Sequence, residues 1–320
     1  MKVLIIGGAG YIGSTLSREL WEQGHEVTVF DALLFGDESV RSLIGERRFE
    51  LVQGDIRDRE ALAEVVPGHD AVCLLAAIVG EPACNRDPET AVEVNLQGAR
   101  NVAQAALAAG IPRFVFTSTC SNYGVSDRNG LVNEEAPLQP ISTYSETKVT
   151  AEQELLAMKS ESFHPTVLRL STAFGISERM RFDLLVSDFT LAAQRDRKIV
   201  IYGGGCWRPF VHVNDIAAAF QSVLQVDIDL VSGEVFNVGT NDANVQKLEL
   251  GERIQQELPE TEIELVQNNA DPRSYRVDFT KVNSRLGYRP RHSIRDGIRE
   301  LRVALEAGQW SDPSAPQYHN

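Results

Sequence analysis

The sequence has little of several features that mark other classes of protein. Its 320 residues hold 31 basic against 45 acidic side chains, and this charge of −14 opposes binding to nucleic acid or anionic membrane. The four cysteines show no C-x-x-C spacing, which argues against a zinc site and a disulfide scaffold. The first apolar run breaks at Gly7, too early for a signal peptide or a membrane span. These absences favour a reducing, cytoplasmic setting.

The N-terminus carries a strand, a glycine-rich turn and a helix in that order. A β-branched run over residues 2–6 leads into Gly7, Gly10 and Gly13, and a helical pattern follows through Glu22. This order places backbone N–H groups at a helix N-terminus, where a pyrophosphate binds. The glycine spacing differs from the common dinucleotide fingerprint by one residue in its first interval. A tight turn without a ligand is the alternative, and the flanking strand and helix disfavour it.

A second strand over residues 27–30 ends at Asp31. A carboxylate at this strand end can accept hydrogen bonds from both hydroxyls of an adenosine ribose, whereas it would repel a 2′-phosphate. The next basic residue is Arg41. The sequence therefore favours NAD over NADP as a ligand, although Asp31 could simply begin a turn.

Further strands are predicted over residues 51–56, 70–77 and 113–117, with a long helix over 88–109. Strands and helices that alternate at these lengths predict an α/β fold with a doubly wound parallel sheet. Ligands on such sheets bind beyond the carboxyl ends of the strands. The hydroxyl-rich loop 118–124 leaves the fifth strand at that edge, although turn chemistry would also explain its composition.

Tyr144 and Lys148 lie four residues apart in a predicted helix, so one helix face carries both side chains. A phenol has a reference pKa of about 10, and a neighbouring cation favours the phenolate, which would make the pair a candidate for proton transfer. The alternative is a chance meeting of two residues on a solvated helix.

Together these segments resemble the extended short-chain dehydrogenase/reductase family, in its nucleotide-sugar epimerase/dehydratase branch. The resemblance includes the run Arg208 to Asp215 and keeps order and spacing over nearly the whole chain. It implies a Rossmann sheet with a smaller C-terminal substrate-binding lobe. Residues 1–175 would form the NAD-binding domain, with segments from about 205–240 returning to it, and 176–320 would mainly form the lobe.

The resemblance also implies roles for individual residues. Tyr144 would take the proton of a sugar hydroxyl, Thr119 would hold the same oxygen, and Lys148 would bind the nicotinamide ribose. Hydride passes to NAD and returns to the other face of a keto-sugar, so one cofactor suffices. The implied cofactor-binding residues are Gly7, Gly10, Tyr11, Ile12, Gly13, Asp31, Asp55, Ile56, Leu75, Ala76, Ala77, Tyr144 and Lys148. The implied substrate-binding residues are Cys120, Ser121, Thr172, Arg208 and Arg273.

Departures from the family pattern bear on the reaction. Members that dehydrate the sugar usually carry Asp-Glu after the threonine, where this chain has Cys120 and Ser121. A dehydratase is therefore disfavoured, and Cys120 could be an acid or base or a buried inert thiol. Thr172 replaces a common asparagine and Pro209 replaces a common aspartate, which leaves the nucleotide undetermined.

The favoured function is thus C4 epimerisation of a nucleotide sugar by a NAD-dependent enzyme. One alternative is a reductase of nucleotide-linked keto-sugars that consumes NAD(P)H, which only Asp31 disfavours. Another is a non-catalytic NAD-binding protein, which would need neither Tyr144 nor Lys148. The resemblance further implies a homodimer that pairs through helices at about 88–109 and 142–160. Residues 309–320 are polar and contain proline, so they are predicted to fray.

Overall fold

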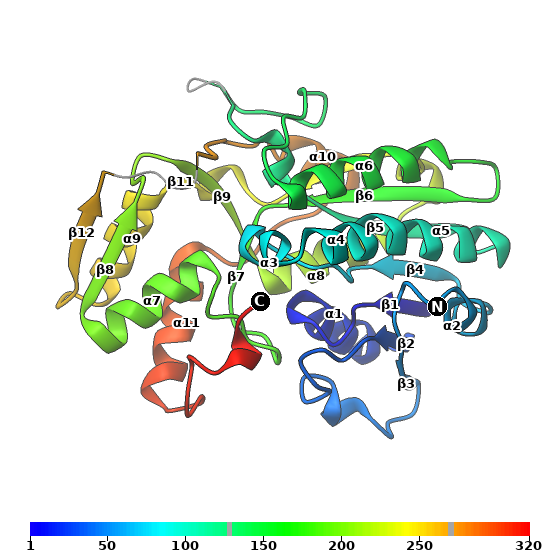
Figure 1. The fold of residues 1–320 in the computed structure, drawn as a ribbon, viewed down its shortest axis with the longest axis horizontal. Coiled ribbons are helices and arrows are strands. Elements are labelled where there is room, and N and C mark those ends of the chain that lie inside the picture. The colour runs from blue at the N-terminus through cyan, green and yellow to red at the C-terminus, as the bar shows by residue number, and fades with distance from the viewer. Residues whose placement is uncertain (127–129, 268–271) are drawn as a thin grey trace.

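The computed structural model describes residues 1–126, 130–267 and 272–320. A seven-stranded parallel sheet, in the order β10-β6-β5-β4-β1-β2-β3, forms its centre (Figure 1). Its strands are β1 (Lys2–Ile6), β2 (Glu26–Asp31), β3 (Phe49–Gln53), β4 (Ala71–Leu74), β5 (Arg113–Thr119), β6 (His164–Leu170) and β10 (Val235–Val238). Strand order reverses direction at β1, and the predicted doubly wound parallel sheet is confirmed.

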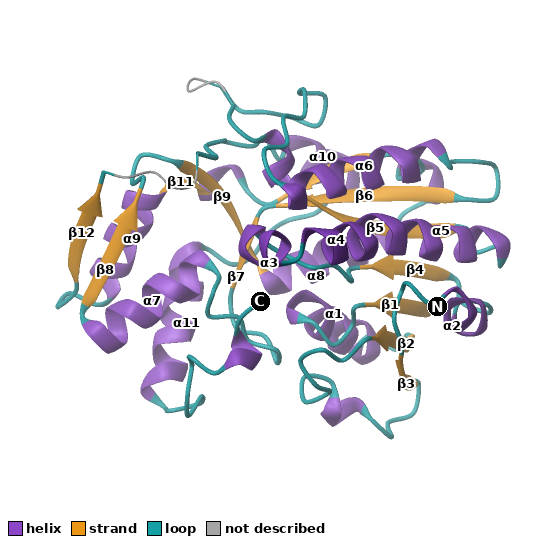
Figure 2. Cartoon of the chain, in the orientation of Figure 1, coloured by secondary structure: helices purple, strands orange, loops and turns teal. Residues whose placement is uncertain are grey.

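Helices cover both faces of this sheet, which explains why its strands are apolar on both sides (Figure 2). In β1, Val3 and Ile5 pack into one core and Leu4 and Ile6 into the other. The first face is covered by α1 (Tyr11–Glu22), α8 (Val213–Gln225) and α10 (Thr280–Leu286). The second is covered by α2 (Arg59–Val65), α5 (Ala99–Ala108) and α6 (Thr143–Ala157).

The predicted long helix at 88–109 is one helical run with an irregular turn inside it. It consists of α4 (Pro88–Val92), a π-helical turn at Glu93–Gly98, and α5; the short helix α3 (Glu81–Arg86) precedes it. A π turn carries one extra residue per turn and is frequent at functional sites. Here the turn contains Asn95, which is buried.

Segments from the second half form a smaller lobe beside the sheet (Figure 1). Its strands β8 (Lys198–Tyr202) and β12 (Glu262–Val266) pair in parallel, and a second small sheet has the order β11-β9-β7. The latter strands are β7 (Thr172–Phe174), β9 (Trp207–His212) and β11 (Asn244–Gln246). The helices of the lobe are α7 (Leu185–Asp196), α9 (Lys247–Glu257) and α11 (Ile294–Glu306), which share one apolar core with these strands.

The prediction that residues 309–320 fray is wrong. The chain after α11 is packed rather than frayed, because the rings of Trp310 and Tyr318 both contact Phe182 edge to face. Helix α8 begins at Val213, and its N-cap is His212, whose Nδ1 accepts from the backbone N–H of Asn214 at 3.2 Å. Within the described residues, no helix combines the length and the apolarity needed to cross a bilayer.

Candidate active site

The glycine turn between β1 and α1 has the shape that a dinucleotide requires. A Cβ on Gly13 would lie 2.1 Å from the carbonyl oxygen of Gly7, so only glycine permits this close packing of turn and helix. A Cβ on Gly10 would meet only that same oxygen, at 3.3 Å, among the described atoms. Gly10 is also the N-cap residue of α1, and no described side chain caps this helix. The backbone N–H groups of the first turn therefore remain available to a pyrophosphate.

Asp31 stands at the end of β2, beside the same turn. Its carboxylate accepts hydrogen bonds from the N–H groups of Ala9 and Leu33, both at 2.9 Å. Burial raises the pKa of Asp31, and these two N–H donors oppose the rise. The carboxylate is thus fixed in direction and keeps free lone pairs toward which a ribose could donate. These residues fit NAD.

The other predicted cofactor residues lie on the same sheet edge, with one difference. The N–H groups of Leu75 and Ala76 bond to the carbonyl of Ile6, which brings this segment beside the glycine turn. Ile56 is buried in the core. The carboxylate of Asp55 is held by Arg57, with Nη2 and Oδ2 2.7 Å apart. An adenine contact by Asp55 therefore competes with this ion pair and stays a prediction.

Asn95 fixes the loop that follows β4, a role that the sequence did not reveal. Its Oδ1 accepts from the N–H of Ile78 at 2.7 Å, and its Nδ2 donates to the carbonyl of the same residue at 2.9 Å. Nδ2 also lies 3.5 Å from the hydroxyl of Thr147 on α6. The π turn that places Asn95 thus ties the loop after β4 to the helix that carries Tyr144 and Lys148.

Helix α6 presents Tyr144 and Lys148 from its first two turns. A capping box formed by Ser142 and Ser145 fixes the start of the helix. The ammonium of Lys148 is buried and donates to the carbonyl of Thr117 at 2.9 Å, and burial lowers its pKa to about 8. Burial raises the pKa of Tyr144, with a smaller lowering by Arg181 and Arg273.

This direction differs from the expectation that Lys148 brings the phenol of Tyr144 toward neutral range. The hydrogen bond to Thr117 directs the ammonium to the end of β5, and Lys148 is not among the groups that shift the pKa of Tyr144. Desolvation of the phenol dominates instead. Without a bound cofactor, burial therefore favours the neutral phenol of Tyr144.

Three hydroxyl groups lie in a chain next to this helix. The backbone N–H of Ser121 donates to Oγ1 of Thr119 at 3.1 Å, and Oγ1 is also 3.1 Å from Oγ of Ser121. Oγ of Ser121 lies 3.3 Å from the hydroxyl of Tyr275, whose charge state influences Tyr144. The sequence did not single out Tyr275. Its position two residues after Arg273 was the available signal, and only the fold brings it to this loop.

Cys120 does not face this hydroxyl chain. Its side chain is 1% exposed, packs within the core and lies 3.3 Å from the carbonyl oxygen of Arg169. Burial raises the pKa of its thiol to about 12. Of the roles that the sequence left open, this burial fits the inert packing thiol better than an acid or base, and a substrate contact by Cys120 stays a prediction.

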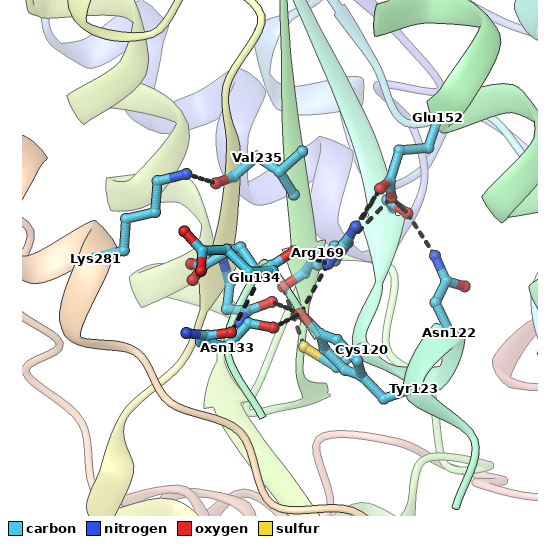
Figure 3. Close-up of polar contacts among 12 residues, drawn as sticks. Cys120, Asn122, Tyr123, Asn133, Glu134, Glu152, Arg169, Val235 and Lys281 are labelled. Atoms are coloured by element: carbon cyan, nitrogen blue, oxygen red, sulfur yellow. Dashed lines mark hydrogen bonds and ion pairs between the residues drawn. The ribbon is translucent and has the colours of Figure 1, made fainter. Parts of the chain in front are cut away.

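A buried ion pair supports the loop 118–124. The guanidinium of Arg169 donates to Glu152 at 2.5 Å and to the hydroxyl of Tyr123 at 2.8 Å, as Figure 3 shows. Glu152 also accepts from Ser118 at 2.7 Å, and Asn122 donates to Ser118 at 3.1 Å. Strand β6, helix α6 and the loop are thus joined by one polar network, which positions the loop that carries Thr119 and Ser121.

The predicted substrate arginines come from separate segments that meet near this site. Arg208 on β9 is buried, and its Nη1 donates to the backbone carbonyl of Arg273. Arg273 in turn forms an ion pair with Glu81, 3.4 Å away on α3. Thr172 lies on β7, which pairs with β9 at the residue pair Thr172 and Phe210. Arg181, whose charge reaches Tyr144, is a further basic group here that the sequence did not indicate.

A dinucleotide-binding parallel sheet with a tyrosine and a lysine on one helix face defines a NAD-binding enzyme of the short-chain dehydrogenase/reductase type. The chain belongs to the NAD dependent epimerase/dehydratase family, whose sequence pattern matches residues 3–239. Its cofactor is NAD, and the family acts on nucleotide sugars.

Individual relatives carry different activities. The low-salt glycan biosynthesis protein Agl12 of Haloferax volcanii is 32% identical, over 93% of this chain and 96% of its own length. A dTDP-glucose 4,6-dehydratase from Streptomyces venezuelae, solved with NAD, has a TM-score of 0.85 at 27% identity and covers 98% of this chain and 99% of its own. A UDP-glucose 4-epimerase from Thermotoga maritima, solved with UDP-glucose, has a TM-score of 0.86 at 26% identity and covers 97% and 100%.

Proposed function

We propose that the protein is a nucleotide-sugar 4-epimerase that retains NAD through each catalytic cycle. The composition of the loop after Thr119 carries this choice. Elimination of water from a sugar needs a general acid and a base for a C–H proton beside the oxidised carbon. In this chain the position after Thr119 holds a thiol turned into the core and the next holds Ser121, a hydroxyl. The nearby carboxylate of Glu81 is paired with Arg273.

In this scheme, the side chains of the site move one proton and hold one oxygen. Bound NAD supplies the acceptor, and later the donor, of the hydride at C4. Tyr144, as the phenolate that a positive charge bound beside its ring would favour, takes the proton of the C4 hydroxyl, and Thr119 donates a hydrogen bond to the same oxygen. Arg208 and Arg273 hold the diphosphate while the keto-sugar rotates to present its other face. Tyr144 then returns the proton to the C4 oxygen of the rotated keto-sugar, so the whole reaction involves no net oxidation.

The test is product analysis with a panel of UDP- and dTDP-linked hexoses, followed by NMR. We expect the C4 epimer to form up to equilibrium without added cofactor and without accumulation of NADH. Tyr144→Phe should lower turnover on the order of 10³-fold, because a positioned acid–base group contributes about that much, while bound NAD is retained. Tyr202→Phe, at a half-exposed strand tyrosine outside the site, is the matched control and should keep its rate.

Two outcomes would refute the proposal. Formation of a 4-keto-6-deoxy sugar would identify a dehydratase. Consumption of one NAD(P)H for each keto-sugar would identify a reductase. Near-normal epimerisation by Tyr144→Phe would refute the mechanism and leave the reaction class standing.

A further inference from the structure

The loop between β7 and α7, residues 175–184, is fastened to the cofactor helix and is called the clamp loop below. The hydroxyl of Tyr11 donates to the carbonyl of Gly175 at 2.6 Å. In return, Oγ of Ser177 donates to the carbonyl of Tyr11 at 2.6 Å and lies 3.0 Å from Oγ of Ser14. Tyr11 and Ser14 belong to the first turn of α1. The clamp loop therefore runs along the end of α1 that faces the dinucleotide.

The last residues of the chain, 310–320, cover the clamp loop and are called the strap. The rings of Trp310 and Tyr318 contact Phe182 at centroid distances of 5.2 and 5.8 Å, both nearly perpendicular. The backbone N–H of Phe182 donates to the carbonyl of Tyr318 at 3.0 Å. These rings extend a small core cluster that includes Tyr11 of the glycine motif. Figure 1 accordingly shows the C-terminus close to the start of α1.

Arg179 of the clamp loop connects the strap to the adenosine end of the site. Its Nη2 donates to the carbonyl of His319 at 3.3 Å and to Oδ1 of Asn320 at 2.8 Å. Its guanidinium carbon lies 3.8 Å from the ring centroid of Phe35, in the loop that follows β2. Its positive charge also lowers the pKa of Asp31, the residue that would meet the ribose. One arginine thus contacts the strap and the loop after β2.

The guanidinium of Arg179 has a donor left over. The side chain is 7% exposed, and its Nε is buried without a hydrogen-bond partner among the described residues. A buried guanidinium N–H that lacks an acceptor is costly, and an acceptor on a ligand would remove that cost. The hydroxyls of a ribose held by Asp31 are acceptors of this kind, because a hydroxyl that donates to a carboxylate keeps its lone pairs.

We propose that Arg179 and the strap form a latch over the adenosine ribose of NAD, and that opening of this latch sets the rate at which the cofactor leaves. Arg179 is the residue that touches the ribose, and Trp310 and Tyr318 are positioning residues that hold the clamp loop closed. This inference rests on the NAD binding of the family and is independent of which sugar reaction follows.

The test measures release of NAD from the full-length protein loaded with the cofactor. Freed NAD is captured by an excess of a coupled dehydrogenase and followed by the fluorescence of NADH. We expect Arg179→Met and Tyr318→Ala each to speed release at least about tenfold, which corresponds to about 1.4 kcal/mol. Tyr318→Phe keeps the ring and should restore slow release. Arg195→Met, at an exposed arginine paired with Asp196, is the matched control and should release NAD at the unchanged rate.

Release at the wild-type rate from both Arg179→Met and Tyr318→Ala would overturn the latch. Faster release from Arg179→Met alone would retain the ribose contact and reject control by the strap. To separate a latch from general loosening, the midpoint of thermal unfolding is measured with and without NAD. A latch predicts that the variants lose the stabilisation that NAD adds, whereas equal losses with and without NAD would contradict it.

Discussion

The cofactor half and the smaller lobe differ in how their candidate site residues are brought together. In the cofactor half, the glycine turn and the Tyr144 to Lys148 pair each lie within a single stretch of seven residues or fewer, on or next to one regular element. At the predicted substrate site, Arg208 comes from β9 of the lobe, Arg273 from a segment far along the chain, and Glu81 from helix α3 in the first half. The comparison teaches that a cofactor site can be encoded locally, whereas the proposed substrate site needs distant segments to pack together.

The network behind the loop 118–124 joins distant segments inside the cofactor half, and breaking it should have the largest effect. Glu152→Ala leaves the guanidinium of Arg169 buried and unpaired, so we expect a loss of about 3 to 5 kcal/mol in the free energy of unfolding. Chemical denaturation monitored by fluorescence measures it. Glu154 lies on the same helix as Glu152, is more exposed, and pairs with Arg100. Glu154→Ala should cost about 0 to 1 kcal/mol in the free energy of unfolding. Equal losses in the two variants would show that burial is not decisive.

A pair of substitutions separates the two halves directly. Gly13→Ala places a Cβ 2.1 Å from the carbonyl of Gly7, and the shift of the turn should cost about 1 to 3 kcal/mol and most of the bound NAD. Arg208→Lys keeps the charge but loses the planar fork, so KM for the nucleotide sugar should rise about tenfold while NAD stays bound. Gly205→Ala, with open space around its Cβ, is the control. NAD content and KM are the measurements, and loss of NAD from Arg208→Lys would contradict the separation.

Lys148 should give the smallest effect, a dependence of stability on pH. Burial lowers its pKa to about 8 in the folded chain, against about 10.4 in the unfolded chain. Between these values the unfolded chain binds more protons, so the free energy of unfolding rises with pH. Relative to Lys148→Met, the cofactor-free wild type should gain about 1.5 kcal/mol from pH 8 to 9.5. Urea unfolding at both pH values checks this, and a constant difference would place the ammonium in a more polar setting.

In the cofactor half, the sequence predicted the first strands and helix correctly, because the sequence signals of these elements are periodic and local. The strand over residues 2–6, the helix through Glu22 and the strand that ends at Asp31 are found in the structure. The helix at 88–109 was predicted as one regular helix, yet it contains a π turn at Asn95, since hydrophobic spacing does not reveal one extra residue in a turn. Likewise, the polar composition of residues 309–320 suggested fraying, although the rings of Trp310 and Tyr318 in this segment pack against Phe182.

By itself, the sequence determined the parallel α/β fold, the glycine turn, Asp31 and the helix face with Tyr144 and Lys148, because each depends on neighbours along the chain. Only the tertiary structure decided that Cys120 faces the core, that Tyr275 joins Thr119 and Ser121, and that Arg179 lies between Phe35 and the chain's end. It also decided that the ammonium of Lys148 donates to the carbonyl of Thr117. These outcomes depend on burial and on contacts between residues far apart in sequence, where local pattern carries no information about direction or distance.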